Sequence, residues 1–369
     1  MKTINRIQPI SGVGDKAAAC ILLDYDGKRI LLDLGEGPAP GQLPDMGDVD
    51  HVDALIISHT HRDHIGGFPL LPRLGNPPVF ATAGAFSLMA SSAEHAFQQG
   101  GILPANGTAD VIGISVTTGR SGHAPGGVWV HLDVAGGVLY CGDICLESPL
   151  YVYDPPPPAR VVILDASYGL DDTPQAERIA ALTPFFNGDG LLLPIPPDGR
   201  GPDIAVYLAK HERTLPALDP ATREMIKNLL AENRPYAHDG VIPVLEKLAA
   251  EAPSVNGGNP KIVMIAASGS AISGTSAELT ARWENDENPA IVFTGFMPPG
   301  SPARRLVEMG RAHFLRWNVH PRHADNVALV RETGAEIVLP AFCDAVDNET
   351  GWRRDFAPAD LCLKGPVAL

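Results

Sequence analysis

Short apolar runs separated by glycine, proline and charged residues form the main pattern in the first half of the chain. Two such runs flank Asp26-Gly27, a pair that favours a tight turn, so residues 18–35 are expected to form a β-hairpin. Runs of this length are typical of strands. Further strands are therefore expected at 52–57, 78–82, 111–118, 128–134, 137–141 and 161–164, with a helix from about 83 to Gln99.

From about residue 180 the pattern changes to strands that alternate with amphipathic helices. Apolar runs predict strands at 191–195, 261–266 and 290–294, and helical periodicity predicts helices at 203–212, 219–232, 241–251 and 274–286. A strand, a glycine-containing loop and a helix in repetition are typical of a parallel α/β unit. After it, we expect a helix from His323 to about Glu332 and a last strand at 336–339.

Potential metal ligands gather at the end of the apolar run at 52–57. His59 and His61 are two residues apart, so on an extended backbone both imidazoles project from the same side. Asp63 and His64 follow at once, and these donors are the ones that zinc and its neighbours prefer. Because the adjacent Asp63 and His64 cannot easily join the two histidines on one ion, the spacing predicts two metal ions side by side.

Two later residues stand in the same kind of position as His59. His123 follows Gly122 after one predicted strand, and Asp143 follows Gly142 after another. Either alone is typical of a turn. Together with the earlier cluster, we expect His123 to complete the ion of His59 and His61, and the Asp143 carboxylate to bridge both ions.

Charge and composition narrow the class of protein. The chain has 369 residues, 45% of them hydrophobic and 19% charged, which is typical of a globular protein. Its net charge of −15 argues against tight non-specific binding to nucleic acid. Residues 304–323 are an exception, with five arginines and three histidines. This stretch is either a solvated helix face followed by a loop or a basic wall that faces an anionic substrate.

The compartment is expected to be the cytoplasm. No apolar run is long enough to span a bilayer, so no membrane partner is expected, and the first residues lack the apolar core of a signal peptide. The five cysteines include no C-x-x-C pair, which favours free thiols in a reducing compartment over a cysteine metal site.

The assembled motifs resemble the metallo-β-lactamase superfamily. His59-Thr60-His61-Arg62-Asp63-His64 is similar to its H-x-H-x-D-H signature, and Asp33, His123 and Asp143 lie at its flanking motifs in the right order. Later segments resemble the β-CASP nucleases of RNA processing and DNA repair. These segments are Leu164–Gly169, Ala267–Gly274, Phe293–Arg304 and His323-Ala324-Asp325.

The resemblance implies an α/β fold: an αββα sandwich formed by residues 1–177 and 319–369, with a β-CASP-like cap inserted at 178–318. It also implies roles for individual residues. His59, His61 and His123 would hold one ion, Asp63 and His64 the other, and Asp143 would bridge them. Asp63 would hold the attacking water, and Asp165 would orient His323 as the proton donor. Ser268, Ser270 and Arg304 would bind substrate.

The sequence departs from the family at the end of the last strand, where Ala341 stands in place of the last metal histidine. Water, His320 or His323 could fill that position, or the second ion could be weakly bound or absent. We expect two divalent ions, zinc with manganese as the alternative, in a phosphodiesterase that acts on RNA rather than DNA. The alternatives are a hydrolase of small esters, thioesters or phosphoesters, and a catalytically inactive subunit that binds RNA or a partner nuclease. A homodimer is expected from the resemblance.

Overall fold

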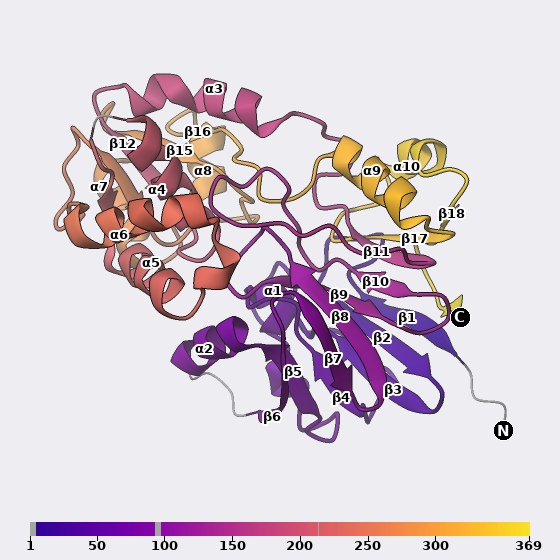
Figure 1. Ribbon diagram of the computed structural model, residues 1–369. Coiled ribbons are helices and arrows are strands. Elements are labelled where there is room, and N and C mark those ends of the chain that lie inside the picture. The colour runs from indigo at the N-terminus through magenta and orange to yellow at the C-terminus, as the bar shows by residue number, and fades with distance from the viewer. Residues whose placement is uncertain (1–4, 93–96, 213) are drawn as a thin grey trace. The chain divides into compact units, whose positions relative to one another are not determined.

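The computed structural model describes residues 5–92, 97–212 and 214–369, and the chain divides into two compact units (Figure 1). Unit 1 consists of residues 1–146, 153–172 and 320–369, and unit 2 of residues 147–152 and 173–319. The domain limits at 178 and 318 expected from the sequence remain a prediction.

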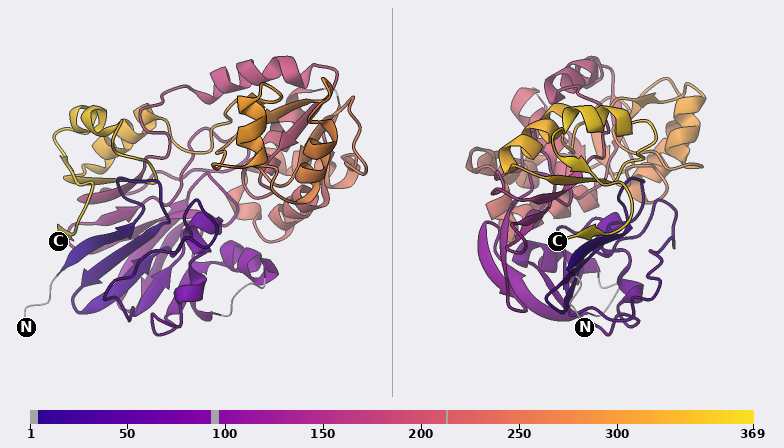
Figure 2. Two further views of the ribbon diagram at one scale, coloured as in Figure 1. Left: turned by 180° about the vertical axis from the view of Figure 1, so that it is seen from behind. Right: turned by 90° about the vertical axis from the view of Figure 1, so that its right-hand side faces the viewer.

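Unit 1 contains two seven-stranded sheets. The first has the strand order β19-β1-β2-β3-β4-β5-β6, and Figure 2 shows its indigo and purple strands from behind. Its strands are β1 (Arg6–Ser11), β2 (Cys20–Tyr25), β3 (Lys28–Leu32), β4 (Ala54–Ile56), β5 (Pro78–Thr82), β6 (Gln98–Leu103) and β19 (Val367–Ala368). The Asp26-Gly27 turn joins β2 and β3 in the expected antiparallel hairpin, with Tyr25 opposite Lys28.

The second sheet has the order β18-β17-β11-β10-β9-β8-β7. Its strands are β7 (Gly107–Val111), β8 (Ile114–Arg120), β9 (Val128–Leu132), β10 (Val138–Tyr140), β11 (Val161–Asp165), β17 (Ile337–Ala341) and β18 (Asp360–Leu361). In its centre, β11 is parallel to both β10 and β17, so the ends of these strands bring distant parts of the chain to one edge.

Helices cover the outer face of each sheet of unit 1. Those against the first sheet are α1 (Arg62–Ile65), η1 (Phe68–Leu70) and α2 (Ala83–Ser92), and those against the second are α9 (His323–Thr333) and α10 (Glu349–Asp355). The alternate strand residues, such as Ile21 and Leu32 or Val138 and Ile163, are also fully buried, because the inner faces of the sheets pack on each other. These layers confirm the αββα sandwich.

Unit 2 is built around a five-stranded parallel sheet with the order β13-β14-β12-β15-β16. Its strands are β12 (Leu191–Pro194), β13 (Ala217–Leu218), β14 (Val263–Ala266), β15 (Ala290–Phe293) and β16 (His313–Phe314). Its helices are α3 (Gln175–Phe186), α4 (Arg200–His211), α5 (Pro220–Ala231), η2 (Arg234–Tyr236), η3 (Asp239–Val241), α6 (Ile242–Glu251), α7 (Gly274–Trp283) and α8 (Pro302–Glu308).

The helices of unit 2 divide between the two faces of its sheet. Apolar residues of α3 to α6 pack with Leu191, Leu193 and Ile265, whereas those of α7 and α8 pack with Leu192 and Met264. A parallel sheet covered on both faces confirms the α/β unit expected from the sequence.

Two expected elements differ from the structure. The helix expected to reach Gln99 ends earlier, because β6 already begins at Gln98; part of that segment, residues 93–96, lies outside the described residues. The strand β7 was not expected, because its residues Gly107–Val111 include few apolar ones and face solvent along much of their length. None of the described helices combines the length and apolar character that a membrane crossing requires.

Candidate metal centre

The loop that carries the histidine cluster is anchored on Asp33, which follows β3 and is fully buried. Asp33 Oδ1 accepts the backbone N–H of Ser58 at 2.7 Å, and Asp33 Oδ2 accepts the Ser58 hydroxyl at 2.6 Å. The hydroxyl of Tyr140, from the opposite sheet, donates to Asp33 Oδ2 at 2.6 Å. These bonds fix where β4 ends and the histidines begin.

The same carboxylate sets which ring nitrogens face inward. His64 Nδ1 lies 2.7 Å from Asp33 Oδ2 and donates to it, which leaves the Nε2 lone pair for another ligand. Ser58 Oγ donates to Asp33 and therefore accepts from His59 Nδ1, 3.1 Å away. Both imidazoles are held in the tautomer that a metal ligand needs.

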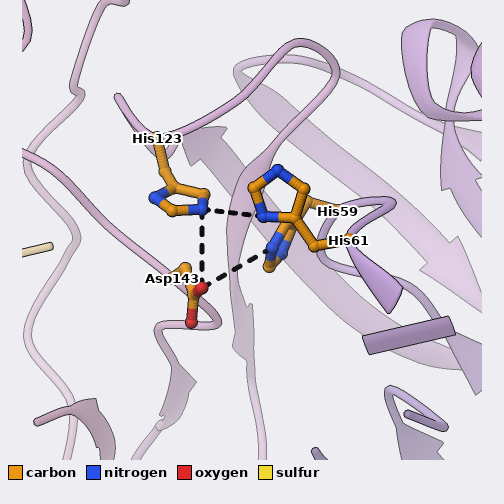
Figure 3. Close-up of side chains that lie close together, drawn as sticks. All are labelled: His59, His61, His123 and Asp143. Carbon is orange, nitrogen blue, oxygen red and sulfur yellow. Dashed lines mark hydrogen bonds and ion pairs between the residues drawn. The ribbon is translucent and has the colours of Figure 1, made fainter. Parts of the chain in front are cut away.

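The first group of potential ligands consists of His59, His61, His123 and Asp143 (Figure 3). Their ligand atoms all lie within 4.8 Å of one another. Asp143 Oδ2 is 3.7 Å from His59 Nε2 and 3.4 Å from His123 Nε2, and His123 Nε2 is 3.0 Å from His61 Nδ1. Three imidazoles and one carboxylate in this arrangement suit a four-coordinate cation.

The second group consists of Asp63, His64 and Asp143. Here the other oxygen of the shared carboxylate is used, since His64 Nε2 is 3.3 Å from Asp143 Oδ1. Asp63 is exposed to solvent, whereas His64 and Asp143 are buried. Asp143 therefore directs one oxygen toward each group, which is the placement that a bridging ligand requires.

The unsatisfied polar atoms of this centre fit a cation. Within residues 5–92, 97–212 and 214–369, His59 Nε2, His64 Nε2 and Asp143 Oδ1 are buried without a hydrogen-bond partner. Buried polar atoms are normally paired, and one cation in each group would pair these atoms. The His and Asp clusters of this unit could hold metal ions.

The charges of the two groups differ. Burial, with His64 and the other imidazoles around it, holds the pKa of His59 well below its usual value. Burial also acts to lower the pKa of His64, but Asp143 and Asp33 outweigh it and hold that pKa well above the usual value. His59 is thus neutral as a metal ligand must be, whereas a proton competes with a cation for His64.

A third group beside the centre contains Asp143, Asp165 and His320. Asp165, at the end of β11, accepts from His320 Nδ1 at 3.0 Å, and also from the backbone N–H of Ile144 and from the N–H and hydroxyl of Ser167. Both Asp165 oxygens are thereby occupied. Burial acts to raise the pKa of Asp165, but His320 and the hydrogen bonds hold it below its usual value.

The position of His320 links this pair to the first group. His320 Nδ1 is 3.7 Å from Asp143 Oδ2, and its ring centroid is 4.9 Å from that of His123 and 5.1 Å from that of Tyr168. Burial acts to lower its pKa, but Asp165 and Asp143 raise that pKa above the usual value.

The pairing of Asp165 with His323 expected from the family resemblance differs from the structure. His323 begins α9, and its Nε2 is 2.8 Å from Asp355 Oδ2 at the end of α10. It lies three positions after His320, and that step carries the His323 side chain to the α10 side, where its ring centroid lies 5.8 Å from that of Phe356. His320 precedes a proline in the sequence, and the residue before a proline favours an extended backbone. That signal could have identified His320 as a candidate site residue.

The end of β17 supplies no ligand side chain. Ala341 is fully buried and pairs in register with Asp165 of β11. The next residue, Phe342, has a φ of 65° and places its ring centroid 5.1 Å from that of His64. An aromatic ring therefore lies against His64, and the second group has three potential ligands where the first has four.

The substrate-binding candidates from the sequence lie in unit 2. Ser270 O accepts the backbone N–H of Ala303 at 3.3 Å, Ser268 Oγ lies 3.5 Å from Ser273 O, and Arg304 donates to Met297 O at 3.1 and 3.2 Å. Within the arginine-rich stretch, Arg305 pairs with Glu284 at 2.6 Å and Arg322 with Asp325 at 2.8 Å. Two of the five arginines of that stretch are thus paired with carboxylates.

Comparison with known proteins identifies the two parts of the chain. A family model of the metallo-beta-lactamase superfamily matches residues 13–184, and one of the Beta-Casp domain matches residues 203–306.

The relatives carry names of RNA-cutting enzymes. The chain is 27% identical to ribonuclease TTHA0252 of Thermus thermophilus, over 85% of this chain and 86% of that protein. It is 24% identical to endoribonuclease YSH1 of Yarrowia lipolytica, over 81% of this chain and 43% of that protein. It is 25% identical to endoribonuclease ysh1 of Emericella nidulans, over 96% of this chain and 50% of that protein. The chain thus spans about half the length of these fungal relatives.

A solved structure supports the fold alone. A protein of unknown function from Enterococcus faecalis superposes with a TM-score of 0.62 at 13% identity, over 99% of this chain and 100% of that one. The family resemblance expected from the motifs is confirmed. The chain thus contains a metallo-β-lactamase superfamily domain, matched over residues 13–184, and a β-CASP domain, matched over residues 203–306.

Proposed function

We propose that the protein is a metal-dependent phosphodiesterase that cleaves RNA. The observation that carries this proposal is Asp143, a buried carboxylate whose two oxygens face two different ligand groups beside the Asp165–His320 pair. The names of the relatives, which include ribonucleases and endoribonucleases, support RNA as the substrate.

Each of the two groups would hold one divalent cation, and Asp143 would belong to both groups. The nitrogen-rich donor set of the first group favours zinc, and manganese is the alternative. When bound, the paired divalent cations would lower the pKa of a coordinated water toward neutrality. They would also offset the negative charge of the phosphodiester that is cleaved.

Asp63 is the residue proposed to orient the attacking water. Desolvation of the carboxyl group by its neighbours acts to raise its pKa, but His64 and His61 outweigh that effect, so the pKa of Asp63 lies below its usual value. It therefore stays a carboxylate that can accept a hydrogen bond from water. Its exposure to solvent leaves it accessible to water.

His320 is the residue proposed to give a proton to the leaving oxygen. Asp165 holds His320 Nδ1, which leaves Nε2 as the atom for proton transfer, and the raised pKa favours the protonated ring. This assignment replaces the pairing of Asp165 with His323 and leaves Asp165 as a positioning residue. His323, the donor expected from the sequence, remains the competing assignment.

Hydrolysis of a small ester or phosphoester is a second candidate activity, which the net charge of −15 favours.

In unit 2, Ser268, Ser270 and Arg304 stay the proposed substrate-contacting residues, although the Arg304 guanidinium already bonds Met297 O. A homodimer and a cytoplasmic location remain predictions, which solution mass and cell fractionation would test.

The test compares substrates on one zinc-loaded preparation. Labelled single-stranded RNA, DNA of the same sequence, bis(p-nitrophenyl) phosphate and a thioester are offered separately. The control is Asp133→Asn, at an exposed carboxylate that belongs to neither ligand group. We expect RNA to be cut fastest. If no preparation loaded with zinc or manganese cuts any oligonucleotide while a small ester is hydrolysed, the RNA proposal is wrong.

A further inference from the structure

The loops at the carboxyl ends of β12, β14 and β15 form a distinct surface of unit 2. Helix α4 leaves β12 on one face of the sheet, and α7 leaves the neighbouring β14 on the other. Adjacent strands whose helices depart to opposite faces leave a crevice at their carboxyl ends, where ligands of open α/β sheets bind. Residues 196–199, 267–273 and 295–301 line this edge.

These loops are held against one another. A side chain at Gly295 would collide with the Arg200 guanidinium, so that guanidinium lies directly on the loop after β15. A side chain at Gly269 would likewise collide with Pro196. Ser270 O accepts the Ala303 N–H, which joins the loop after β14 to the start of α8. The edge is therefore formed before any ligand arrives.

Two large apolar side chains stand exposed on this edge. Phe296 is 48% exposed and Ile272 is 60% exposed, in loops that the contacts above hold in place. The Arg304 guanidinium bonds the carbonyl oxygen of Met297, the residue after Phe296, at 3.1 and 3.2 Å. An exposed aromatic ring on an ordered loop is thus accompanied by a cation.

We infer that Phe296 is a stacking platform for an unpaired nucleobase of the RNA, with Ile272 beside the base and the nearby cation facing the sugar-phosphate backbone. The inference rests on the proposed function and extends it to unit 2. Aromatic faces next to cations are the usual means of holding single-stranded nucleic acid. A protein partner would need about 800 Å² of surface, far more than two side chains supply.

The test measures binding of a fluorescent single-stranded oligoribonucleotide by anisotropy, with the full chain in EDTA so that no strand is cut. Phe296→Ala should weaken binding by about 5- to 100-fold, the range for loss of one stacked base, and Phe296→Trp should restore it. Phe314→Ala serves as a matched control, because Phe314 is another exposed aromatic residue of the same unit, on β16. That control should bind like the original protein.

A strand with one abasic position separates stacking from other effects. Moving the abasic position along the strand should find one place where the original protein loses affinity and Phe296→Ala does not. Equal binding by the original protein and Phe296→Ala would overturn the inference alone. Absence of any RNA binding or cutting by the original protein would instead overturn the proposed function. A change of solution mass in Phe296→Ala, with RNA affinity unchanged, would assign Phe296 to contacts between copies of the chain and also overturn the inference.

Discussion

The two ligand groups that share Asp143 differ in how completely they can surround a cation. The first provides three imidazoles and a carboxylate, and the second provides one imidazole, the exposed Asp63 and the same carboxylate. The Phe342 ring lies against His64 of the second group. Four protein ligands suit a firmly held ion, whereas three leave a position open for water or substrate.

This difference suggests that the two ions on either side of Asp143 would have different roles. The first ion would be retained and would organise the site, and the second would exchange more readily. The following predictions test that asymmetry, and they begin with the change that should affect both positions.

Asp143→Asn should have the largest effect, because it removes the anionic oxygen that each group uses. We expect the metal content to fall below one ion per chain and RNA cutting to fall by more than the roughly 100-fold that loss of an outer-sphere partner costs. Elemental analysis and a cutting assay measure both quantities. Retention of two ions would contradict a bridging role for Asp143. Asp133→Asn should keep both ions and full activity.

Substitution of His320 should have the next largest effect on RNA cutting, and substitution of His323 is its matched control. His320→Asn should slow cutting by about 10²- to 10⁴-fold, the usual contribution of a general acid, without loss of metal. His323→Asn should change the rate by less than about tenfold, because His323 bonds Asp355 instead. If His323→Asn slowed cutting more than His320→Asn, His323 rather than His320 would be the proton donor. Metal loss in His320→Asn would make His320 a ligand.

Ala341→His should sharpen the comparison by adding a ligand to the second group. Ala341 pairs in register with Asp165 on adjacent parallel strands, so the two side chains point to the same face of the sheet. We expect the second ion to bind on the order of 10- to 100-fold more tightly, measured by titration calorimetry. Ala341→Leu controls for added volume. Equal gains in both variants would show that packing, not ligation, is responsible.

Acidification should release the ion of the second group at a higher pH than the ion of the first group. This is the smallest of the expected effects. His64 has a raised pKa and His59 a lowered one. As the pH falls, His64 takes up a proton before His59 does, and each protonation displaces a metal ion. Dialysis between about pH 8 and pH 5, followed by elemental analysis, should show the second ion lost at the higher pH. Simultaneous loss would contradict unequal positions.

Local patterns in the sequence were sufficient for most of the fold. The Asp26-Gly27 hairpin and the strand–loop–helix alternation after residue 180 are short-range signals, and both are confirmed. The strand β7 was missed because its polar residues carry no apolar alternation. The structure also brings His59, His61, Asp63, His64, His123 and Asp143 together, although metal binding by them stays a prediction.

The partner of Asp165 could not be predicted in the same way. Asp165 and His320 lie 155 positions apart, and which of two neighbouring histidines meets the carboxylate depends on where α9 begins. A helix boundary is uncertain by a residue or two, and the two candidates lie only three positions apart in the sequence. The role of Phe342 depends on a positive φ that an aromatic residue rarely adopts, so its contact with His64 carried no sequence signal.

The most direct measurement is anomalous scattering at the zinc edge from crystals of the zinc-loaded protein. Two peaks are expected on either side of the Asp143 carboxylate, the stronger one among His59, His61 and His123 and the weaker one beside Asp63 and His64. A folded protein without any peak between these side chains would contradict the account. So would a stronger peak at the three-ligand position.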